Sequence, residues 1–220
     1  MMAPREAYAL WAATWDADAG ALIALETAWM SPRLENVAGL RVVDAGCGTG
    51  RWLTGLRERG ASAVGFDASP EMLAVAVAKG CAVGLADLCR LPVRDASADV
   101  VLCALSLGHM ARACQAIGEL ARLVKPGGRL LISDFHPEAH HRGWRRTFRH
   151  GGAVHEVLHH AHAVADIMGA AAGHGLLLEE LLEPGFDERQ RVYFDRAGKS
   201  LEAVRGVPAL LLARWRRPCS

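Results

Sequence analysis

Short apolar runs rich in β-branched residues alternate with helical patterns between residues 40 and 135. The runs predict five strands, at 40–44, 63–67, 82–86, 99–104 and 129–135. Amphipathic segments or helix-start signals predict helices between them, at 51–59, from Pro70 to about Gly80, and at 112–123. Strands that alternate with helices favour a mostly parallel sheet, because each parallel pair needs a crossover connection. The pattern therefore predicts a Rossmann-like, doubly wound α/β fold with helices on both faces of the sheet.

The regular alternation stops after residue 135. Residues 136–153 are polar, basic and rich in histidine, which is typical of an inserted loop or lid. Val154–Ala172 is predicted to be a helix, and the apolar runs 176–182 and 208–214 are predicted to be the last two of seven strands. At the other end of the chain, 4–18 and 19–30 carry the patterns of two helices, the second ended by Ser31 and Pro32.

We predict one domain over residues 1–220, because no linker or repeat divides the chain. Within it we expect four segments. They are an N-terminal helical lid (1–35), a cofactor-binding core (36–135), a substrate lid and helix (136–175), and the segment with the last two strands (176–220).

Composition narrows the range of partners. The 220 residues are 51% hydrophobic and carry a formal net charge of +1, so no overall field favours nucleic acid or a membrane surface. No apolar run approaches the roughly 20 residues that cross a bilayer, and the N-terminus lacks the apolar core of a signal peptide. The six cysteines form no C-x-x-C pair and fit small hydrophobic residues in a reducing compartment. We therefore expect a cytoplasmic protein, a monomer or homodimer, whose partner is a small molecule.

The loop Asp44–Gly50 is the most informative segment of the chain. It follows the first predicted strand, places glycine at every second position from Gly46 to Gly50, and leads into a helix. Glycine permits positive φ and lets a ligand contact the backbone directly. The N–H groups at a helix N-terminus suit a carboxylate. A dinucleotide site favours G-x-G-x-x-G instead, so the spacing points to another ligand.

This loop resembles motif I of the class I S-adenosylmethionine-dependent methyltransferases, and later segments match that family in order. Val64–Ser69 resembles the second-strand motif, Ala86–Leu88 the third-strand motif, and Leu102–Met110 the motif at the end of the fourth strand. The segment Leu123–Gly128, with its Lys-Pro-Gly-Gly turn, resembles the turn before the fifth strand. The chain is thus similar to the small-molecule, type 11-like branch, whose cofactor is S-adenosylmethionine.

The resemblance implies a set of cofactor contacts. Asp44 would orient the methionine amino group, Asp67 would hold the ribose hydroxyls, and Asp87 would accept from the adenine amine. The N-terminal pair Trp15-Asp16 resembles a lid segment that usually reads Tyr-Asp. The whole predicted set is Trp15, Asp44, Gly46, Cys47, Gly48, Gly50, Asp67, Ala68, Asp87, Leu88, Ala104 and His109.

The methyl acceptor is harder to predict, because displacement at a sulfonium carbon needs alignment, and needs a base only when the acceptor arrives protonated. Eight of the ten histidines lie between residues 136 and 162. If 154–172 is a helix, His155, His159, His162 and Asp166 share one face. Three interpretations stay open: solvated histidines, a substrate pocket with one histidine base, or a metal site, which no cysteine pair supports. His109, His136 and His159 are the candidate bases.

The segment 143–149 mixes basic and aromatic residues. On a nearly neutral chain it favours a small anionic molecule over nucleic acid. The candidate substrate-binding residues are Trp144, Arg145, Arg146 and His155. We expect methyl transfer to a small molecule, with an oxygen or nitrogen acceptor ahead of carbon. The alternatives are a carboxyl methyltransferase that acts on a carrier-bound acyl chain, and a cofactor-binding module without transfer activity.

Overall fold

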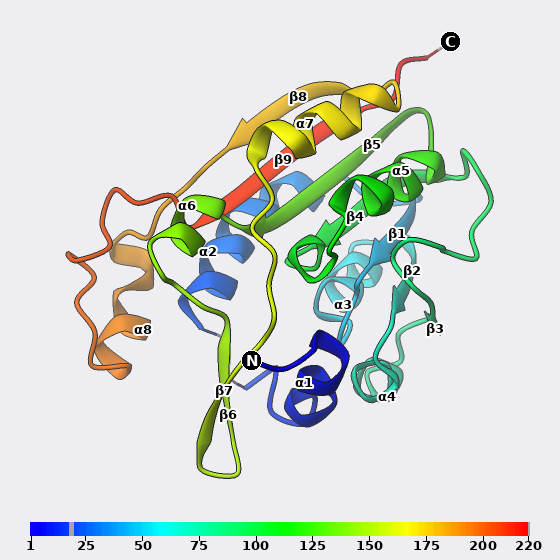
Figure 1. The fold of residues 1–220 in the computed structure, drawn as a ribbon. Coiled ribbons are helices and arrows are strands. Elements are labelled where there is room, and N and C mark those ends of the chain that lie inside the picture. Colours follow the sequence, from blue (N-terminus) through cyan, green and yellow to red (C-terminus); the bar gives the residue numbers. More distant parts are fainter. Residues whose placement is uncertain (18–19, 220) are drawn as a thin grey trace.

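The computed structural model describes residues 1–17 and 20–219, and its centre is a seven-stranded sheet (Figure 1). The strand order is β3-β2-β1-β4-β5-β9-β8. The first five strands in the chain pair in parallel, β9 is antiparallel to β5, and β8 is antiparallel to β9. This confirms the predicted seven-stranded, mostly parallel sheet. The strands are β1 (Arg41–Ala45), β2 (Ser62–Asp67), β3 (Val83–Leu85), β4 (Ala98–Ala104), β5 (Val124–Phe135), β8 (Leu177–Leu182) and β9 (Leu210–Arg216).

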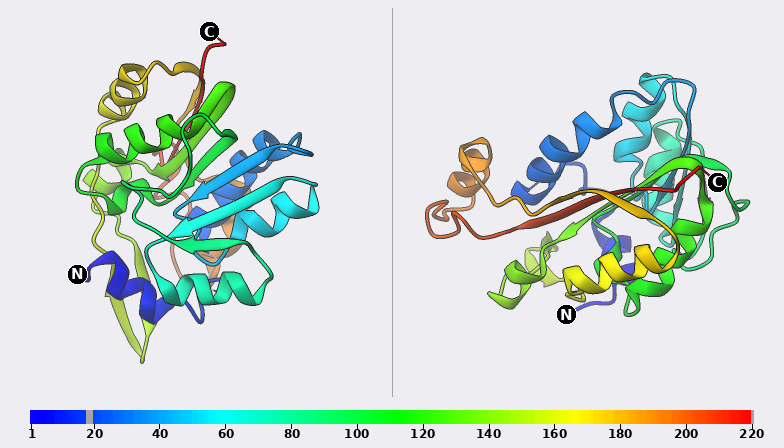
Figure 2. Two further views of the ribbon diagram at one scale, coloured as in Figure 1. Left: turned by 90° about the vertical axis from the view of Figure 1, so that its right-hand side faces the viewer. Right: turned by 90° about the horizontal axis from the view of Figure 1, so that it is seen from above.

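Helices cover both faces of the sheet. On one face, α5 (Ala113–Leu123) and α7 (Val164–Gly173) bury Ile117, Leu120 and Ile167 against the strands. On the other, α2 (Ala21–Met30) and α3 (Arg51–Glu58) bury a second apolar cluster, and the view from above separates α7 from α2 (Figure 2). The remaining helices are α1 (Pro4–Trp11), α4 (Pro70–Ala78), α6 (Pro137–His141), α8 (Arg191–Arg196) and the 3-10 turns η1 (Ser31–Leu34), η2 (Leu107–His109) and η3 (Glu188–Gln190).

A two-stranded hairpin, β6 (Thr147–His150) with β7 (Ala153–Glu156), lies beside the N-terminal helix α1 (Figures 1 and 2). The Trp11 and Phe148 rings stack with centroids 4.9 Å apart. The backbone N–H of Met2 donates to Glu156, at 2.8 Å. The hairpin therefore fixes α1 in place from outside the sheet.

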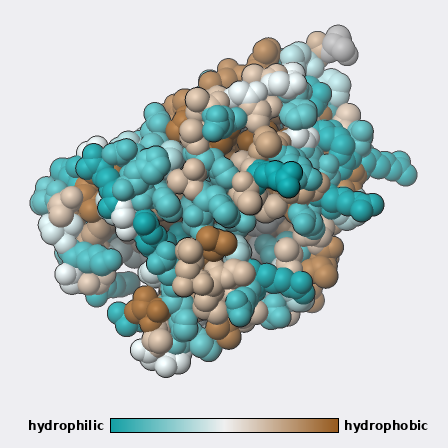
Figure 3. All heavy atoms as spheres, viewed as in Figure 1, coloured by the Kyte–Doolittle hydropathy of each residue, from teal (hydrophilic) through white to brown (hydrophobic). Residues whose placement is uncertain are grey.

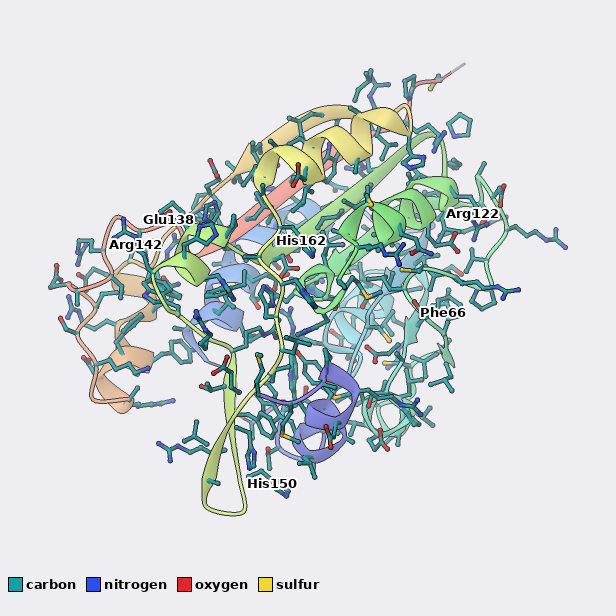
Figure 4. The ribbon with its side chains drawn as sticks, viewed as in Figure 1. Phe66, Arg122, Glu138, Arg142, His150 and His162 are labelled. Carbon is teal, nitrogen blue, oxygen red and sulfur yellow. The ribbon has the colours of Figure 1, made fainter. Side chains whose placement is uncertain are left out.

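The predicted helix over Val154–Ala172 is wrong in its first half. Gly151 and Gly152 both take positive φ and form the hairpin turn, so the following residues continue as β7. Residues 157–163 then belong to no helix and to none of the named strands, and α7 begins only at Val164. The histidines of this stretch consequently share no helical face, and Figure 4 shows His150 at the hairpin tip, well apart from His162.

The N-terminal prediction also needs correction. The helix expected over 4–18 ends at Trp11, and residues 12–17 form turns. Positions 18 and 19, which the two predicted helices included, lie outside the described residues, and α2 begins at Ala21. Among residues 1–17 and 20–219, no helix is both long and apolar enough to cross a bilayer. The face seen in Figure 3 is mostly hydrophilic, with scattered hydrophobic groups.

A buried ion pair joins α2 to the first turn of α3. Glu26, which is 0% exposed, accepts from Arg51 at 2.7 Å and from Ser133 at 2.9 Å. Removing the cation from a buried pair leaves an uncompensated charge. We therefore expect Arg51→Met to lower the free energy of unfolding by about 3 kcal/mol, as measured by urea denaturation.

The matched control is Arg142→Met, at the residue that directly follows α6. Arg142 also pairs with a glutamate at 2.7 Å, but both side chains of that pair are about half exposed. Exposed pairs contribute about 1 kcal/mol or less, so this variant should lose little stability. An equal loss in the two variants would contradict the structural role assigned to the buried pair.

Candidate functional site

A cavity of about 310 Å³ lies at the carboxyl ends of β1, β2, β3 and β4, where open α/β sheets bind their ligands. Its walls come from the loop after β1, from Asp67 at the end of β2, and from Asp87 after β3. The segment 104–110 after β4 supplies a further wall. Helix α1 and Trp15 line the remaining side, so the N-terminal segment borders the cavity. We call it the first cavity.

The glycine loop forms the floor of the first cavity. Gly46 and Gly48 have φ of 79° and 53°, values that residues other than glycine rarely adopt. A Cβ on Gly46 would lie 2.4 Å from the Ser106 hydroxyl oxygen, so the loop leaves no room for one. Gly50, also with positive φ, precedes α3 and does not line the cavity. Its role in the structure is to turn the chain into the helix.

Asp67 ties the loop to the second strand. One carboxyl oxygen accepts from the Gly48 N–H at 2.8 Å, and the other accepts from the Ser69 N–H at 2.9 Å. Burial raises the pKa of Asp67, while these backbone hydrogen bonds act to lower it. Each oxygen keeps a second lone pair, so the carboxylate can still accept from a diol.

Asp44 is a polar group of the first cavity whose cost of burial is not offset by hydrogen bonds from the described residues. It is 1% exposed, and neither carboxyl oxygen has a hydrogen-bond partner among residues 1–17 and 20–219. Burial raises its pKa to about 7, in spite of the opposing charge of Arg51. An unpartnered carboxylate in a cavity wall carries a cost that a bound cation would remove. The site is therefore suited to a ligand with an ammonium group.

Tyr8 and His109 form a hydrogen-bonded pair in the same wall. The Tyr8 hydroxyl lies 2.8 Å from Nε2 of His109, and Nδ1 lies 3.2 Å from the Leu158 carbonyl oxygen. A carbonyl can only accept, so Nδ1 carries the proton and Nε2 accepts from Tyr8. Burial, reinforced by the charge of Arg146, holds the pKa of His109 well below its usual range, which keeps the ring neutral.

The N-terminal segment is anchored to the glycine loop by Asp16. Its carboxylate accepts from the Thr49 hydroxyl at 2.8 Å and pairs with Lys79 at 2.6 Å. Trp15, directly before it, lines the first cavity. The Trp15-Asp16 segment is thus held against the glycine loop at the edge of the first cavity. Tyr8 was not among the predicted site residues, although it is one of only two tyrosines in the chain and lies within the segment predicted as a lid.

The structure brings most of the predicted cofactor residues together. All of them except Gly50 line the first cavity: Trp15, Asp44, Gly46, Cys47, Gly48, Asp67, Ala68, Asp87, Leu88, Ala104 and His109. Residues that the sequence analysis did not name, including Tyr8, Met72 and Ser106, complete the lining. Tyr8 and Met72 belong to no motif, and Ser106 lies within the Leu102–Met110 motif without being singled out by it.

Two of the three candidate bases lie outside this lining. His136 caps α6 by accepting from the Glu138 N–H, and its Nε2 lies 2.8 Å from Glu183. His159 is packed against Gly108, and burial lowers its pKa to about 4. Its Nε2 is 3.9 Å from Asp134. Of the candidate bases, His109 is the one that the structure places in the first cavity.

The remaining predicted histidine, His155, lies on the hairpin, where its ring stacks on Phe148 at 5.3 Å. It lines neither this cavity nor the one described next. Across residues 1–17 and 20–219, no group of three or more histidine, cysteine, aspartate or glutamate side chains could hold a metal ion. All six cysteines are free thiols.

A second cavity, of about 840 Å³, adjoins the first. Trp144 and Arg145, both predicted to bind substrate, line it. Trp15 and Arg146 line both cavities, so the two spaces share a wall. The other two predicted substrate residues are far less close to each other in role. Arg146 lies at this shared wall, whereas His155 lies on the hairpin.

Residues 43–132 match a family model described as a methyltransferase domain. The chain is 41% identical over 105 residues to a demethylmenaquinone methyltransferase from Thermus thermophilus, covering 44% of this chain and 48% of that one. It is 28% identical over 186 residues to a malonyl-(acyl-carrier protein) O-methyltransferase from Pectobacterium atrosepticum, covering 82% of this chain and 69% of that one. The chain spans about half the length of the first of these curated relatives.

Solved structures extend the match beyond the family model. An S-adenosylmethionine-dependent methyltransferase from Mesorhizobium loti aligns with a TM-score of 0.68 at 25% identity, over 86% of this chain and 97% of that one. A possible histamine N-methyltransferase from Thermotoga maritima aligns with a TM-score of 0.71 over 97% of this chain and 99% of that one. Its identity of 16% supports the fold alone. The similarity therefore includes the last two strands, where the sequence motifs are weak.

Proposed function

We propose that this chain, which belongs to the class I S-adenosylmethionine-dependent methyltransferases, transfers a methyl group from that cofactor to a small-molecule acceptor. The observation that carries the proposal is the unpartnered carboxylate of Asp44, buried beside the Gly46–Gly48 loop in one cavity with Asp67. Asp44 can pair with an ammonium group, the glycine loop permits a close backbone contact, and Asp67 can accept from a ribose diol. When bound, the cofactor would supply an electrophilic methyl group on a sulfonium.

The chemistry of the wall gives each part of the cofactor a partner. Asp44 would hold the methionine ammonium, and the first N–H groups of α3 would face its carboxylate. Asp67 would accept from the ribose hydroxyls. Asp87 already accepts from the Cys89 N–H at 2.7 Å through one oxygen, which leaves the other for the adenine amine. Leu88 and Met72 give the purine apolar walls.

The Tyr8–His109 pair would serve the acceptor. Because the pKa of His109 lies well below its usual range, its Nε2 is unprotonated at neutral pH and holds the Tyr8 hydroxyl in one orientation. That hydroxyl can accept from an acceptor O–H or N–H and relay the proton to Nε2. An oxygen or nitrogen acceptor uses this pair more directly than carbon does. The N-terminal lid would exclude water from the same space.

The proposal is tested by incubating the protein with methyl-labelled S-adenosylmethionine and a panel of metabolites that carry hydroxyl, amine or carboxyl groups. We expect transfer to at least one of them. Failure to transfer to any, with S-adenosylhomocysteine still bound, would favour the alternative of a cofactor-binding module.

Tyr8→Phe gives a sharper test with any acceptor found in that panel. The ring should keep its stacking on Trp11, while the hydroxyl is lost. We expect kcat for an acceptor that arrives protonated to fall by about a hundredfold or more, in the range of one general acid–base contact. The Kd for S-adenosylhomocysteine should change little. An unchanged kcat would contradict the role assigned to Tyr8.

A carrier-bound acyl chain is the second candidate acceptor. The malonyl-(acyl-carrier protein) O-methyltransferase match extends over 82% of this chain, well beyond the motifs of the core. Arginines beside the second cavity would suit a carboxylate on such a chain. A malonylated carrier protein belongs in the panel for this reason. Transfer to it, with none to the free acids, would favour this alternative.

A further inference from the structure

The second cavity has an aromatic wall. It lies between α2, the segment that joins α6 to β6, and α8, three elements far apart in the sequence. The Trp144 ring stacks on Phe186 at 5.8 Å, and Phe186 meets Phe194 edge-on at 5.1 Å. Phe135, Tyr193, Trp11 and Trp15 add further rings to the lining. Such walls favour a flat apolar molecule, because stacked and edge-on ring contacts add to the free energy of apolar burial.

The charges in this lining are all positive. Arg145, Arg146, Arg196 and Lys199 line the cavity, and no aspartate or glutamate does so among the residues that the structure describes. Arg145 is 3.6 Å from Glu156, while no ion pair is found for the other three within residues 1–17 and 20–219. The cavity therefore combines apolar rings with a positive potential, which favours an anion over a neutral molecule of the same shape.

Arg146 is the central cation of this arrangement. It is 8% exposed, and its Nη1 donates to the Leu105 carbonyl at 2.7 Å. No carboxylate of the described chain lies within ion-pair distance of it, and burying a charge without a partner costs free energy. It also lines the first cavity, together with Trp15. An anion held by this guanidinium would lie where the two cavities share a wall.

We propose that the second cavity binds the methyl acceptor, and that the acceptor is a flat aromatic molecule with an anionic group that pairs with Arg146. This inference rests on the proposed function, since it places the acceptor next to the methyl donor. The rings hold the aromatic body, and the guanidinium fixes its charged end toward the first cavity. Arg196 and Lys199, both exposed, add to the positive potential that attracts the anion to the second cavity.

The test uses three probes of one shape: 1-naphthoate, 1-naphthalenemethanol and 1-naphthylmethylamine. Their binding to the full chain is measured by titration calorimetry, with and without saturating S-adenosylhomocysteine. We expect 1-naphthoate to bind about tenfold or more tightly than the alcohol, in line with one charge-assisted hydrogen-bonded pair, and the amine to bind most weakly. The naphthoate and S-adenosylhomocysteine should bind together, each at one site.

Arg146→Met should remove the preference for naphthoate over the alcohol, and Arg146→Lys should keep part of it. The control is Arg142→Met, which removes the same charge from the exposed α6 pair with Glu138 (Figure 4), outside both cavities. That variant should keep the preference. Arg146→Lys also provides a test if the methionine variant does not fold.

Three results would overturn the inference: equal affinity for naphthoate and alcohol, a preference that survives Arg146→Met, or displacement of S-adenosylhomocysteine by naphthoate. The proposed function is judged separately, by S-adenosylhomocysteine binding and by methyl transfer to the metabolite panel. If that ligand fails to bind, the methyltransferase proposal fails. The naphthoate comparison would still decide whether the second cavity selects an aromatic anion.

Discussion

Gly46→Ala is expected to weaken S-adenosylhomocysteine binding by about a hundredfold or more, the largest effect that we expect from a single methyl group. The added Cβ would lie 2.4 Å from the Ser106 hydroxyl oxygen and 2.6 Å from its Cβ. Ser106 cannot move freely, because its hydroxyl lies 3.1 Å from both the Gly46 and the Ala104 carbonyl oxygens and donates its one hydrogen to this pair of acceptors. Relief of the clash must therefore displace the loop that lines the first cavity.

The control for this substitution is Gly152→Ala in the hairpin turn. Gly152 has the same φ of 79° as Gly46, but a Cβ there would meet nothing within 4 Å. Both variants carry the cost of an L-residue in the left-handed region, about 1–2 kcal/mol, and only Gly46→Ala adds the clash. We expect calorimetry to show normal binding for Gly152→Ala. Equal weakening in both variants would mean that the loop does not form the ligand cradle.

Asp44→Asn is expected to stabilise the ligand-free protein while it weakens cofactor binding. The carboxylate is buried with no hydrogen-bond partner in the described part of the chain, and burial raises its pKa to about 7. At pH 8 the folded protein therefore carries a costly charge that the amide would avoid. We expect a gain of roughly 2–4 kcal/mol in the free energy of unfolding at pH 8, together with at least a tenfold weaker Kd for S-adenosylhomocysteine.

The effect of Asp44→Asn on the free energy of unfolding should depend on pH. The folded pKa of Asp44 is raised above its unfolded value of 3.8, so the folded state holds the proton more tightly. Its contribution to stability is complete below pH 3.8 and is lost as the pH rises toward about 7 and beyond. The gain from Asp44→Asn should therefore shrink at pH 5, as measured by urea unfolding. A stability gain that is constant between pH 5 and pH 8 would contradict an unpartnered, titrating Asp44.

The same titration applies to binding. An ammonium pairs with the ionised form of Asp44, so affinity for S-adenosylhomocysteine should increase as the pH rises through about 7. The variant should lack this increase. A buried group that destabilises the free protein and favours the complex is a common compromise at functional sites.

The parallel sheet could be predicted from sequence because its signals are local. Each strand of the core is a short apolar run bounded by a turn, and the helices between them have amphipathic patterns or clear start signals. The glycine loop and Asp67 were identifiable for the same reason, since their spacing along the chain determines their place at the strand ends. Gly50 shows the limit of this reasoning, because its positive φ turns the chain into α3 and leaves it outside the cavity.

The hairpin could not be predicted from hydrophobic periodicity, because 154–162 is rich in histidine, which fits either a helix or a strand. Two consecutive glycines at positive φ form a tight turn that favours a strand after it, and packing against α1 stabilises the hairpin. The Tyr8–His109 pair could not be predicted from local sequence patterns either, since its members are 101 positions apart. The second cavity brings together α2, α6–β6 and α8, a long-range arrangement that no local pattern encodes.

A crystal structure of the chain with S-adenosylhomocysteine would test the central claim most directly. We expect the ammonium beside Asp44, the ribose hydroxyls at Asp67, the adenine near Asp87 and Leu88, and the sulfur toward the wall shared with the second cavity, at Trp15 and Arg146. A ligand bound in the reverse orientation, or outside the first cavity, would contradict the claim that this cavity is built for S-adenosylmethionine.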